Sequence, residues 1–362
     1  MKRRWILLAA AGIGLTGYGQ KPSSANTPFT LTWTAGRCVR CTITKDLGRI
    51  QFTSPSRAWA IGYSFPPPGA QGFGDYVVVH TVDAGRTWRE LPQTYQHAGD
   101  ADGPPAFSFL DAARGWIAWW NPADEPRMIR TRDGGRHWQT VSHEFLQKVQ
   151  FFDENHGYGA EVTKFLRTDD GGRTWIETQI PHLRFIDRMS FQTPTLGWIA
   201  GTDDKGFLVF RTTDGGRSWE EARSTAPREL ADVRDLFFLD QRRGWLITWH
   251  YNDSGTYLFF TVDGGKSWAS EPDPAFQGKG KWAGVTRFLS ERNGVVFESE
   301  DAAGSSSGFD RHAIIYTADG GTNWHKEPTP YFVDDCQVFE GDLLCSASNS
   351  KWGFGILKLH WK

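Results

Sequence analysis

The sequence predicts an all-β fold, a seven-bladed β-propeller built from four-stranded antiparallel blades. Three observations lead to this prediction. A turn motif recurs six times, an aromatic element precedes each copy, and the 362 residues include 18 Trp, 25 Phe and 40 Gly. This composition suits short strands that pack face to face and are joined by tight turns, and long amphipathic helical patterns are absent.

The turn motif reads T-x-D-x-G-x-x-W, and we refer to it as the Asp box. Successive aspartates lie 37 to 56 residues apart, which indicates a repeat architecture. The copies are TVDAGRTW (Thr81–Trp88), TRDGGRHW (Thr131–Trp138), TDDGGRTW (Thr168–Trp175), TTDGGRSW (Thr212–Trp219), TVDGGKSW (Thr261–Trp268) and TADGGTNW (Thr317–Trp324). Their aspartates are Asp83, Asp133, Asp170, Asp214, Asp263 and Asp319, and their tryptophans are Trp88, Trp138, Trp175, Trp219, Trp268 and Trp324.

The residue types of the Asp box predict a structural role. The carboxylate can accept hydrogen bonds from backbone N–H groups of its own turn, and glycine supplies the positive φ that a tight turn needs. The Thr side chain caps the same turn, and the Trp packs between neighbouring sheets. We therefore expect these aspartates to be structural rather than catalytic.

The aromatic element consists of an aromatic run, a turn and a Gly-Trp pair or a close equivalent. Clear copies are FSFLDAARGW (Phe107–Trp116), FFDENHGY (Phe151–Tyr158), SFQTPTLGW (Ser190–Trp198) and FFLDQRRGW (Phe237–Trp245). Looser copies are QFTSPSRAW (Gln51–Trp59) and RFLSERNGV (Arg287–Val295). A seventh copy, QVFEGDLLCSA (Gln337–Ala347), is followed by one strand-like run instead of an Asp box.

Each repeat therefore supplies strand A (the aromatic run), strand B (from Gly-Trp onward), strand C (ending in the box) and strand D. Units of this length with four strands are propeller blades. The seventh unit lacks its fourth strand, and FTLTWT (Phe29–Thr34) can supply it and close the ring without exposed edges. A six-bladed propeller is the alternative if the last segment is only a tail.

The N-terminus has the pattern of a secretory signal. Lys2, Arg3 and Arg4 precede an apolar run that is too short for a membrane anchor. We expect residues 1–19 to be a signal peptide, 20–28 a linker and 29–362 a single propeller domain. Tyr18 stands where a lipoprotein would carry its lipidated Cys, so the expected protein is periplasmic or extracellular and not lipid-anchored.

The charge balance argues against nucleic acid as a partner. The formal net charge is −2, and it becomes −5 without the three basic residues of the signal segment. An acidic protein is repelled by phosphate backbones.

All four cysteines belong to the region where the ring closes. An exported protein with an even count favours disulfides. Cys336 and Cys345 flank a hairpin and can face each other, which would leave Cys38 to pair with Cys41. Crossed links such as Cys38–Cys345 are the alternative.

Strand alternation sorts the connections onto two faces. The A–B turns and the Asp boxes share the box face, and the B–C and D–A connections share the loop face. The loop-face connections are long, which is typical of binding surfaces on rigid scaffolds. They are Tyr63–Tyr76, Arg89–Ala106, Asn121–Arg127, His250–Gly255, Glu271–Lys281 and Ser299–Arg311.

Two groups of residues on the loop face are candidates for contact with a partner. Aromatic and imidazole side chains end two B strands, where they either anchor a ligand or finish the blade packing: Trp119, Trp120, Trp249, His250 and Tyr251. Basic residues precede the strand A aromatics and would form a ring at the mouth of the central channel, suited to an acidic peptide or a carboxylate, unless they are merely solvated: Arg49, Lys148, Arg188, Arg234 and Arg287.

The sequence predicts no cofactor and no metal site. Asp100-Ala-Asp102-Gly103 has the start of a calcium loop, but the remaining ligands are missing.

Over residues 29–362 the chain resembles the Asp-box (bacterial neuraminidase) repeat superfamily. Within it, the seven repeats, the single domain and the export signal are most similar to photosystem II stability/assembly-factor-like propellers. That resemblance implies a non-catalytic, monomeric binding protein with an arginine patch on one face. Its partner would be a protein, such as a subunit of a membrane complex.

The alternative that the superfamily raises is a sialidase-like glycoside hydrolase or a carbohydrate-binding propeller. Sialidases combine three arginines, a Tyr nucleophile assisted by Glu, and an Asp acid. They also carry an Arg-Ile-Pro motif near their start, whereas here Arg49-Ile50 is followed by Gln51. Seven units rather than six also favour binding over catalysis.

Overall fold

The computed structural model describes most of the chain from Thr27 onward. The residues outside it are 1–26, 40–45, 65–74, 98–103, 120–126, 225–230, 252–254, 272–275, 277–280, 302–308 and 352. The predicted signal peptide and most of the predicted linker lie outside the described residues. No helix in the described part of the chain has the length and hydropathy required to cross a membrane.

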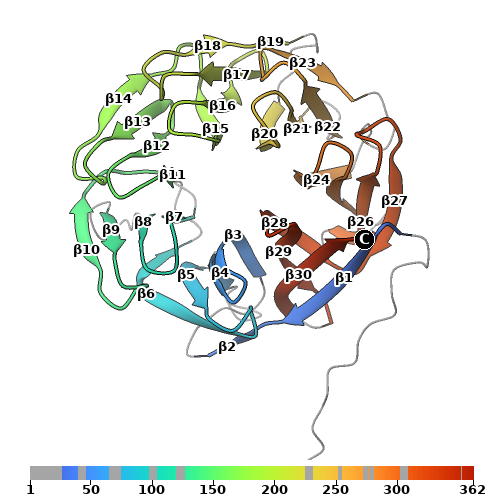
Figure 1. The fold of residues 1–362 in the computed structure, drawn as a ribbon, viewed down its shortest axis with the longest axis horizontal. Helices are drawn as coiled ribbons and strands as arrows, with labels where there is room; N and C mark the ends of the chain where they lie inside the picture. Colours follow the sequence, from blue (N-terminus) through green and yellow to red (C-terminus); the bar gives the residue numbers. More distant parts are fainter. Residues whose placement is uncertain are drawn as a thin grey trace, which may run out of the picture.

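Seven antiparallel sheets are arranged around a central axis, with strand A of each sheet innermost and strand D outermost (Figure 1). Blade 1 contains β3 (Asp46–Ser54), β4 (Arg57–Ser64), β5 (Asp75–Thr81) and β6 (Thr87–His97). Blade 2 contains β7 (Ala106–Phe109), β8 (Gly115–Trp119), β9 (Arg127–Thr131) and β10 (Gln139–Ser142). Blade 3 contains β11 (Lys148–Phe151), β12 (Gly157–Glu161), β13 (Lys164–Thr168) and β14 (Ile176–Gln179). Blades 4 and 5 contain β15 (Phe185–Phe191), β16 (Gly197–Thr202), β17 (Phe207–Thr212) and β18 (Glu220–Glu221); and β20 (Ala231–Phe238), β21 (Gly244–His250), β22 (Gly255–Thr261) and β23 (Ser267–Ser270). Blade 6 contains β24 (Lys281–Phe288), β25 (Gly294–Asp301), β26 (Phe309–Thr317) and β27 (His325–Thr329), and blade 7 contains β28 (Phe332–Phe339), β29 (Asp342–Asn349), β30 (Gly353–Trp361) and β1 (Phe29–Ala35).

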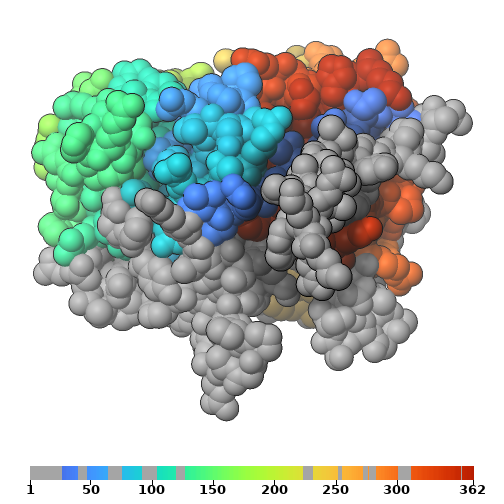
Figure 2. Space-filling model, turned by 90° about the horizontal axis from the view of Figure 1, so that it is seen from below, coloured from blue at the N-terminus to red at the C-terminus, as the bar shows by residue number. Residues whose placement is uncertain are grey.

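The N-terminal strand closes the ring. β1 pairs antiparallel with β30 from Phe29 opposite Trp361 to Ala35 opposite Gly355. In the side view the blue atoms of β1 lie against the red atoms of the C-terminal strands (Figure 2). The prediction of seven blades is therefore confirmed, and the six-bladed alternative is wrong.

Two short strands extend blades beyond the predicted four strands. β2 (Arg37–Cys38) pairs parallel with β6 of blade 1, and β19 (Arg223–Ser224) pairs parallel with β23 of blade 5. Both belong to the connection that enters the blade they extend, so they tie that connection to the outer edge. No periodicity in two residues could have indicated them.

Strands also occupy part of the predicted loops. β6 continues to His97, inside the segment Arg89–Ala106, which the sequence predicts to be a loop. Likewise β25 continues to Asp301, inside Ser299–Arg311. The cause is pairing: β5 and β26 are long enough to offer backbone partners to these residues. The loop-face connections are therefore shorter than the sequence predicts.

The Asp boxes connect strand C to strand D in six blades and share one hydrogen-bond pattern. In blade 4, Asp214 Oδ1 accepts from the backbone N–H of Ser218 at 2.9 Å, and Oδ2 accepts from the Ser218 hydroxyl at 2.6 Å. The Thr212 hydroxyl donates to Asp214 Oδ1 and accepts from the N–H of Gly216. The other five boxes repeat the backbone contact to Oδ1 around Asp83, Asp133, Asp170, Asp263 and Asp319. The side chain before the Trp again contacts Oδ2, through a hydroxyl in three boxes and through His137 and Asn323 in the other two. Each box is therefore a turn locked by its own side chains.

Aromatic stacking joins one blade to the next. In the fourth interface the strand B ring of Trp198 stacks on Phe238 of blade 5 at 3.5 Å, and the box tryptophan Trp268 meets the same Phe edge-on at 5.8 Å. Four further interfaces contain the same trio: Trp59, Phe109 and Trp138; Trp116, Phe151 and Trp175; Tyr158, Phe191 and Trp219; Trp245, Phe288 and Trp324. Trp88 is also buried, in the cluster between blades 7 and 1.

A disulfide joins Cys336 to Cys345 across the β28–β29 pair. This predicted pairing is confirmed, and the crossed alternative Cys38–Cys345 is wrong. Cys38 is also disulfide-bonded, and Cys41 lies outside the described residues.

The first Asp box predicts a simple stabilising substitution. Ala84 adopts φ 59° where the other boxes have glycine, for example Gly171 at φ 77°. A left-handed conformation costs an Ala about 1–2 kcal/mol, and a glycine avoids this cost. Glycine loses more backbone entropy than Ala on folding, which offsets part of the stabilisation. We expect Ala84→Gly to raise the free energy of unfolding by about 0.5–1 kcal/mol in urea titrations.

Gly171→Ala is the matched control and should act in the opposite direction. An added Cβ would lie 2.6 Å from the carbonyl oxygen of Glu154, in addition to the unfavourable φ. Equal effects of the two substitutions would contradict the assignment of strain to Ala84.

The Asp boxes also predict acid sensitivity. The pKa of each box carboxyl is lowered in the folded protein, and hydrogen bonds from the Ser218 hydroxyl and N–H outweigh burial to bring that of Asp214 to about 2. Such groups stabilise the fold above the unfolded pKa of about 4 and lose that contribution as pH falls towards the folded pKa. We expect unfolding free energy to fall between about pH 5 and pH 2. Asp214→Asn should cost about 1 kcal/mol at pH 7, after allowing for exposure, and make this decline shallower.

Candidate functional site

Hydrogen bonds between adjacent innermost strands fix the relative heights of the seven strands A. Three interfaces use a glutamine amide that both accepts from and donates to the backbone of an aromatic residue in the next blade: Gln51 with Phe109, Gln150 with Phe191 and Gln337 with Phe52. The other interfaces use Ser108 with Phe151, Asp187 with Val233, Gln192 with Phe238, Asp235 with Thr286 and Arg287 with Cys336. Residues at the same offset in each strand therefore lie at the same level of the central channel.

One such level carries most of the charge. This level lies three residues before the strand A aromatic in blades 1, 3, 4 and 5, and two residues before Gln337 in blade 7. The residues at these positions are Arg49, Lys148, Arg188, Asp235 and Asp335. In four of these strands the register shifts at or just before this position, and such a bulge re-aims the side chains beside it. Basic groups thus come from blades 1, 3 and 4, and acidic groups from blades 5 and 7.

The acidic groups are fully engaged by the protein itself. Arg287 of blade 6 lies between them: its Nη1 donates to Asp235 at 2.7 Å and its Nη2 donates to Asp335 at 3.0 Å. Asp335 also accepts from the backbone N–H of Ile50 at 3.0 Å, and Asp235 from that of Thr286 at 2.7 Å. These carboxylates are therefore satisfied, and Arg287 is committed to them.

The basic groups are not paired in this way. Among the described residues, no carboxylate forms an ion pair with Arg49, Lys148 or Arg188. Arg49 lies over the Phe107 ring, and Arg188 donates only to the carbonyl oxygen of its neighbour Asp187. We call these three residues the basic arc.

The pKa values of the basic arc reflect its enclosure. Solvent reaches Arg49 and Arg188, yet the channel walls surround them, and the resulting desolvation lowers the pKa of both guanidinium groups. Desolvation, followed by the repulsion of Arg188, lowers the pKa of Lys148 to about 8. Asp335 attracts Arg49, Asp235 and Asp187 attract Arg188, and Asp187 attracts Lys148, but these attractions do not compensate for the loss of water.

The predicted uniform ring of positive charge is therefore only partly correct. Arg234 lies on the inner strand of blade 5 and pairs with Asp232 at 3.4 Å. Arg287 is held by Asp235 and Asp335, two residues that the sequence did not predict to belong to the site. The structure brings Arg49, Lys148 and Arg188 together and neutralises the other two predicted residues.

The predicted aromatic contacts are distributed differently. Trp119 is half-buried and packs into the cluster between blades 1 and 2, and Trp249 is half-buried at the end of β21. His250 is buried, with Nε2 2.9 Å from the Thr248 hydroxyl, so its expected place on the binding surface is wrong. Tyr251 is 54% exposed. Trp120 lies outside the described residues.

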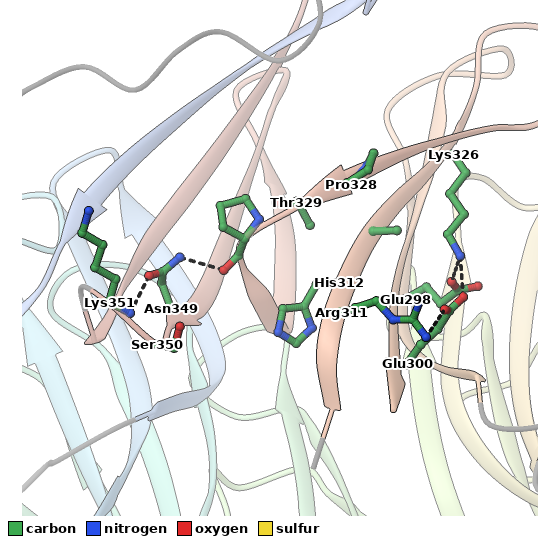
Figure 3. Close-up of a pocket in the computed structure, with 12 residues that line it drawn as sticks. Glu298, Glu300, Arg311, His312, Lys326, Pro328, Thr329, Asn349, Ser350 and Lys351 are labelled. Atoms are coloured by element: carbon green, nitrogen blue, oxygen red, sulfur yellow. Dashed lines mark hydrogen bonds and ion pairs between the residues drawn. The ribbon is translucent and has the colours of Figure 1, made fainter. Parts of the chain in front are cut away.

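A cavity of about 650 Å³ opens beside blades 6 and 7 (Figure 3), and none of the basic arc residues lines it. Strand alternation divides its lining: Glu298 and Glu300 lie on the side of β25 that faces blade 5, and His312 lies on the side of β26 that faces blade 7. Lys326 forms ion pairs with both glutamates. Because these charges already satisfy one another and line two different faces of the blade, the cavity does not present one coherent binding wall.

The tyrosines and the potential metal ligands of the described residues were the other candidates for chemistry. Where a tyrosine pKa departs from its ordinary value it is raised, as for Tyr251, whose hydroxyl donates to Asp232 at 2.5 Å. No group of three potential metal ligands occurs within the part of the chain that the structure describes.

No protein-family model matches the chain, and no curated protein sequence does. Among solved structures it is similar to YCF48 bound to D1 peptide, with a TM-score of 0.61 and 16% identity over 94% of this chain and 97% of that chain. It is also similar to a mutant of Trypanosoma rangeli sialidase displaying trans-sialidase activity, with a TM-score of 0.45 and 12% identity over 91% of this chain and 57% of that chain. The first likeness establishes a shared propeller fold.

Lys148 predicts pH-dependent binding. Because its pKa is lowered to about 8, the basic arc loses one positive charge as pH rises through 8. We expect the affinity for an anionic ligand to be greatest below pH 8 and to fall about tenfold by pH 9.5. Lys148→Arg keeps its charge throughout this range and should remove the decline. A decline of equal size in Lys148→Arg would contradict the assignment.

Proposed function

We propose that this chain is an exported, non-catalytic propeller that binds an acidic segment of a partner protein, with a carboxylate seated in the basic arc. The observation that carries the proposal is the set of three enclosed cations, Arg49, Lys148 and Arg188, that form no ion pair with a carboxylate among the residues the structure describes. Carboxylates bound by guanidinium groups form short, charge-assisted hydrogen bonds. The signal-like N-terminus supports export, and a protein of this kind would be free of a lipid anchor.

The electrostatics of the channel favour an anion over a neutral ligand. Arg49, Lys148 and Arg188 repel one another in an enclosed space, and each is partly desolvated. A bound carboxylate would relieve both costs at once, because it supplies opposite charge and hydrogen-bond acceptors where water is restricted. A neutral ligand would relieve neither.

The comparison with YCF48 bound to D1 peptide supports a peptide as the ligand, since that protein shares the fold. By the same analogy the partner here would be a protein, and a subunit of a membrane complex is a suitable class. Glycoside hydrolysis is the weaker candidate, because the Arg-Ile-Pro motif of sialidases is missing here: Arg49-Ile50 is followed by Gln51.

Labelled peptides test the proposal directly. We would measure fluorescence anisotropy with decapeptide pools that are random except for a fixed central Glu, Gln or Lys. The Glu pool should bind more tightly than the Gln pool, and the Lys pool should bind weakest. Arg49→Ala, Lys148→Ala and Arg188→Ala should each weaken binding of the Glu pool about tenfold, since one hydrogen bond to a charged group contributes about 1.5–3 kcal/mol.

Arg311→Ala is the matched control, because Arg311 is an exposed arginine of blade 6 outside the channel. It removes the same charge and should leave affinity unchanged. If Arg311→Ala weakens binding as much as Arg188→Ala, the effect is one of net charge and the site assignment is wrong. Equal binding of the Glu and Gln pools would overturn the proposal itself.

A further inference from the structure

Two aromatic side chains stand exposed beside the basic arc. Phe185 is 53% exposed at the start of β15 in blade 4, and Tyr251, the residue that follows β21 in blade 5, is 54% exposed. The other large exposed apolar residues described are aliphatic and lie elsewhere: Val82 and Val262 in Asp boxes, and Ile176 on the outer strand β14. Exposed aromatics next to arginines are the usual anchors of protein interfaces.

Phe185 faces the blade that carries Tyr251. Its neighbour Ile186 packs into the cluster between blades 3 and 4. Since successive side chains of a strand point to opposite faces, Phe185 points towards blade 5. β15 and β20 are adjacent there, because the Asp187 carboxylate accepts from the N–H of Val233.

Tyr251 is held in place through its polar end. The hydroxyl donates to Asp232 Oδ2 at 2.5 Å, and Asp232 lies one residue before Val233 on β20. The charges of Asp232, Arg234 and Asp187 all act on this hydroxyl, which places Tyr251 over the junction of blades 4 and 5. With the hydroxyl engaged, the ring itself is what remains open to a ligand.

The position of Phe185 along β15 gives its distance from the basic arc. Phe185 lies opposite Thr202 on β16, and Arg188 lies opposite Ala200, because a bulge intervenes. Two residues along a strand span about 7 Å. A peptide in extended conformation covers the same distance in about two residues.

We propose that Phe185 and Tyr251 form an apolar subsite for the partner segment, which accepts an aliphatic or aromatic side chain about two residues from the carboxylate in the basic arc. The subsite rests on the proposed function and adds the sequence feature that the partner must have. The carboxylate supplies charge recognition, and the apolar side chain covers two rings that water otherwise wets. A purely acidic segment would leave these rings exposed.

Two further decapeptide pools test the subsite. Both carry the fixed Glu, and they differ in having Leu or Ala fixed two positions away on both sides. The wild-type protein should bind the Leu pool about tenfold more tightly than the Ala pool. Phe185→Ala and Tyr251→Ala should each reduce this preference to about twofold, whereas Tyr251→Phe, which keeps the ring, should largely retain it.

Val262→Ala is the matched control, since it removes an equally exposed apolar side chain from the opposite face. It should leave the Leu preference intact. Phe185 is exposed, so its variant should unfold at the same urea midpoint as the wild type. Any loss of preference then reports on binding rather than folding.

The two proposals fail in different ways. If binding depends on Glu and on Arg188 but the Leu and Ala pools bind equally, the subsite is wrong and the basic arc stands. If a neutral oligosaccharide displaces the Leu pool from Phe185 and Tyr251, the rings serve a sugar and the peptide subsite is overturned. If neither pool responds to Arg188→Ala, the proposed function itself is wrong.

Discussion

Contact between neighbouring blades is the constraint on which the rest of this structure depends. Each four-stranded sheet has two apolar faces, and it can bury both only by packing against a sheet on either side. The strand B ring of one blade, such as Trp198, stacks on the strand A ring of the next, Phe238, and the interface is completed by a box tryptophan. Every blade has a neighbour on both sides only in a closed ring. The pairing of β1 with β30 completes the last blade and closes that ring. The Asp boxes set the turn geometry, but the stacking sets the angle at which blades meet.

The same constraint creates the candidate site. Hydrogen bonds such as those from Gln51 to Phe109 and from Gln150 to Phe191 fix adjacent inner strands at one height. Side chains that are far apart in sequence therefore meet at one level of the channel. Because the residue at this level differs between blades, blades 1, 3 and 4 contribute positive charge to the channel and blades 5 and 7 contribute negative charge. The scaffold is periodic, and the proposed site lies where the residue type at one position differs from blade to blade.

The sequence predicted the parts that depend on local chemistry. The boxes with their tryptophans and the seven blades follow from residues close together in the chain or repeated along it. The sequence also offered the Cys336–Cys345 bridge but left crossed links open, and the structure decides between them. The charged residues of the channel were only partly predictable. Their position relative to the strand A aromatic identified Arg49, Lys148 and Arg188. In blades 5 and 7 the same position holds an acid, so a pattern of basic residues does not include Asp235 and Asp335. His250 was misplaced because the inward or outward direction of a strand end depends on register, which sequence alone does not give. Phe185 carried no signal, since an aromatic residue in a strand is usually core.

Solvation alone does not account for the basic arc. Three solvated lysines and arginines would keep ordinary pKa values, whereas the enclosure and mutual repulsion of this group lower them, most clearly at Lys148. Nor is Asp335 free to neutralise the arc. Turning Asp335 to Arg49 would leave the N–H of Ile50 and one arm of Arg287 without acceptors, and those groups lie at the seam where blade 7 meets blade 1. The fold therefore holds Asp235 and Asp335 against Arg287 on one side of the channel. On the other side Asp187 attracts Lys148 and Arg188 but gives its carboxylate to the N–H of Val233, so the arc keeps the positive charge on which the proposed anion site depends.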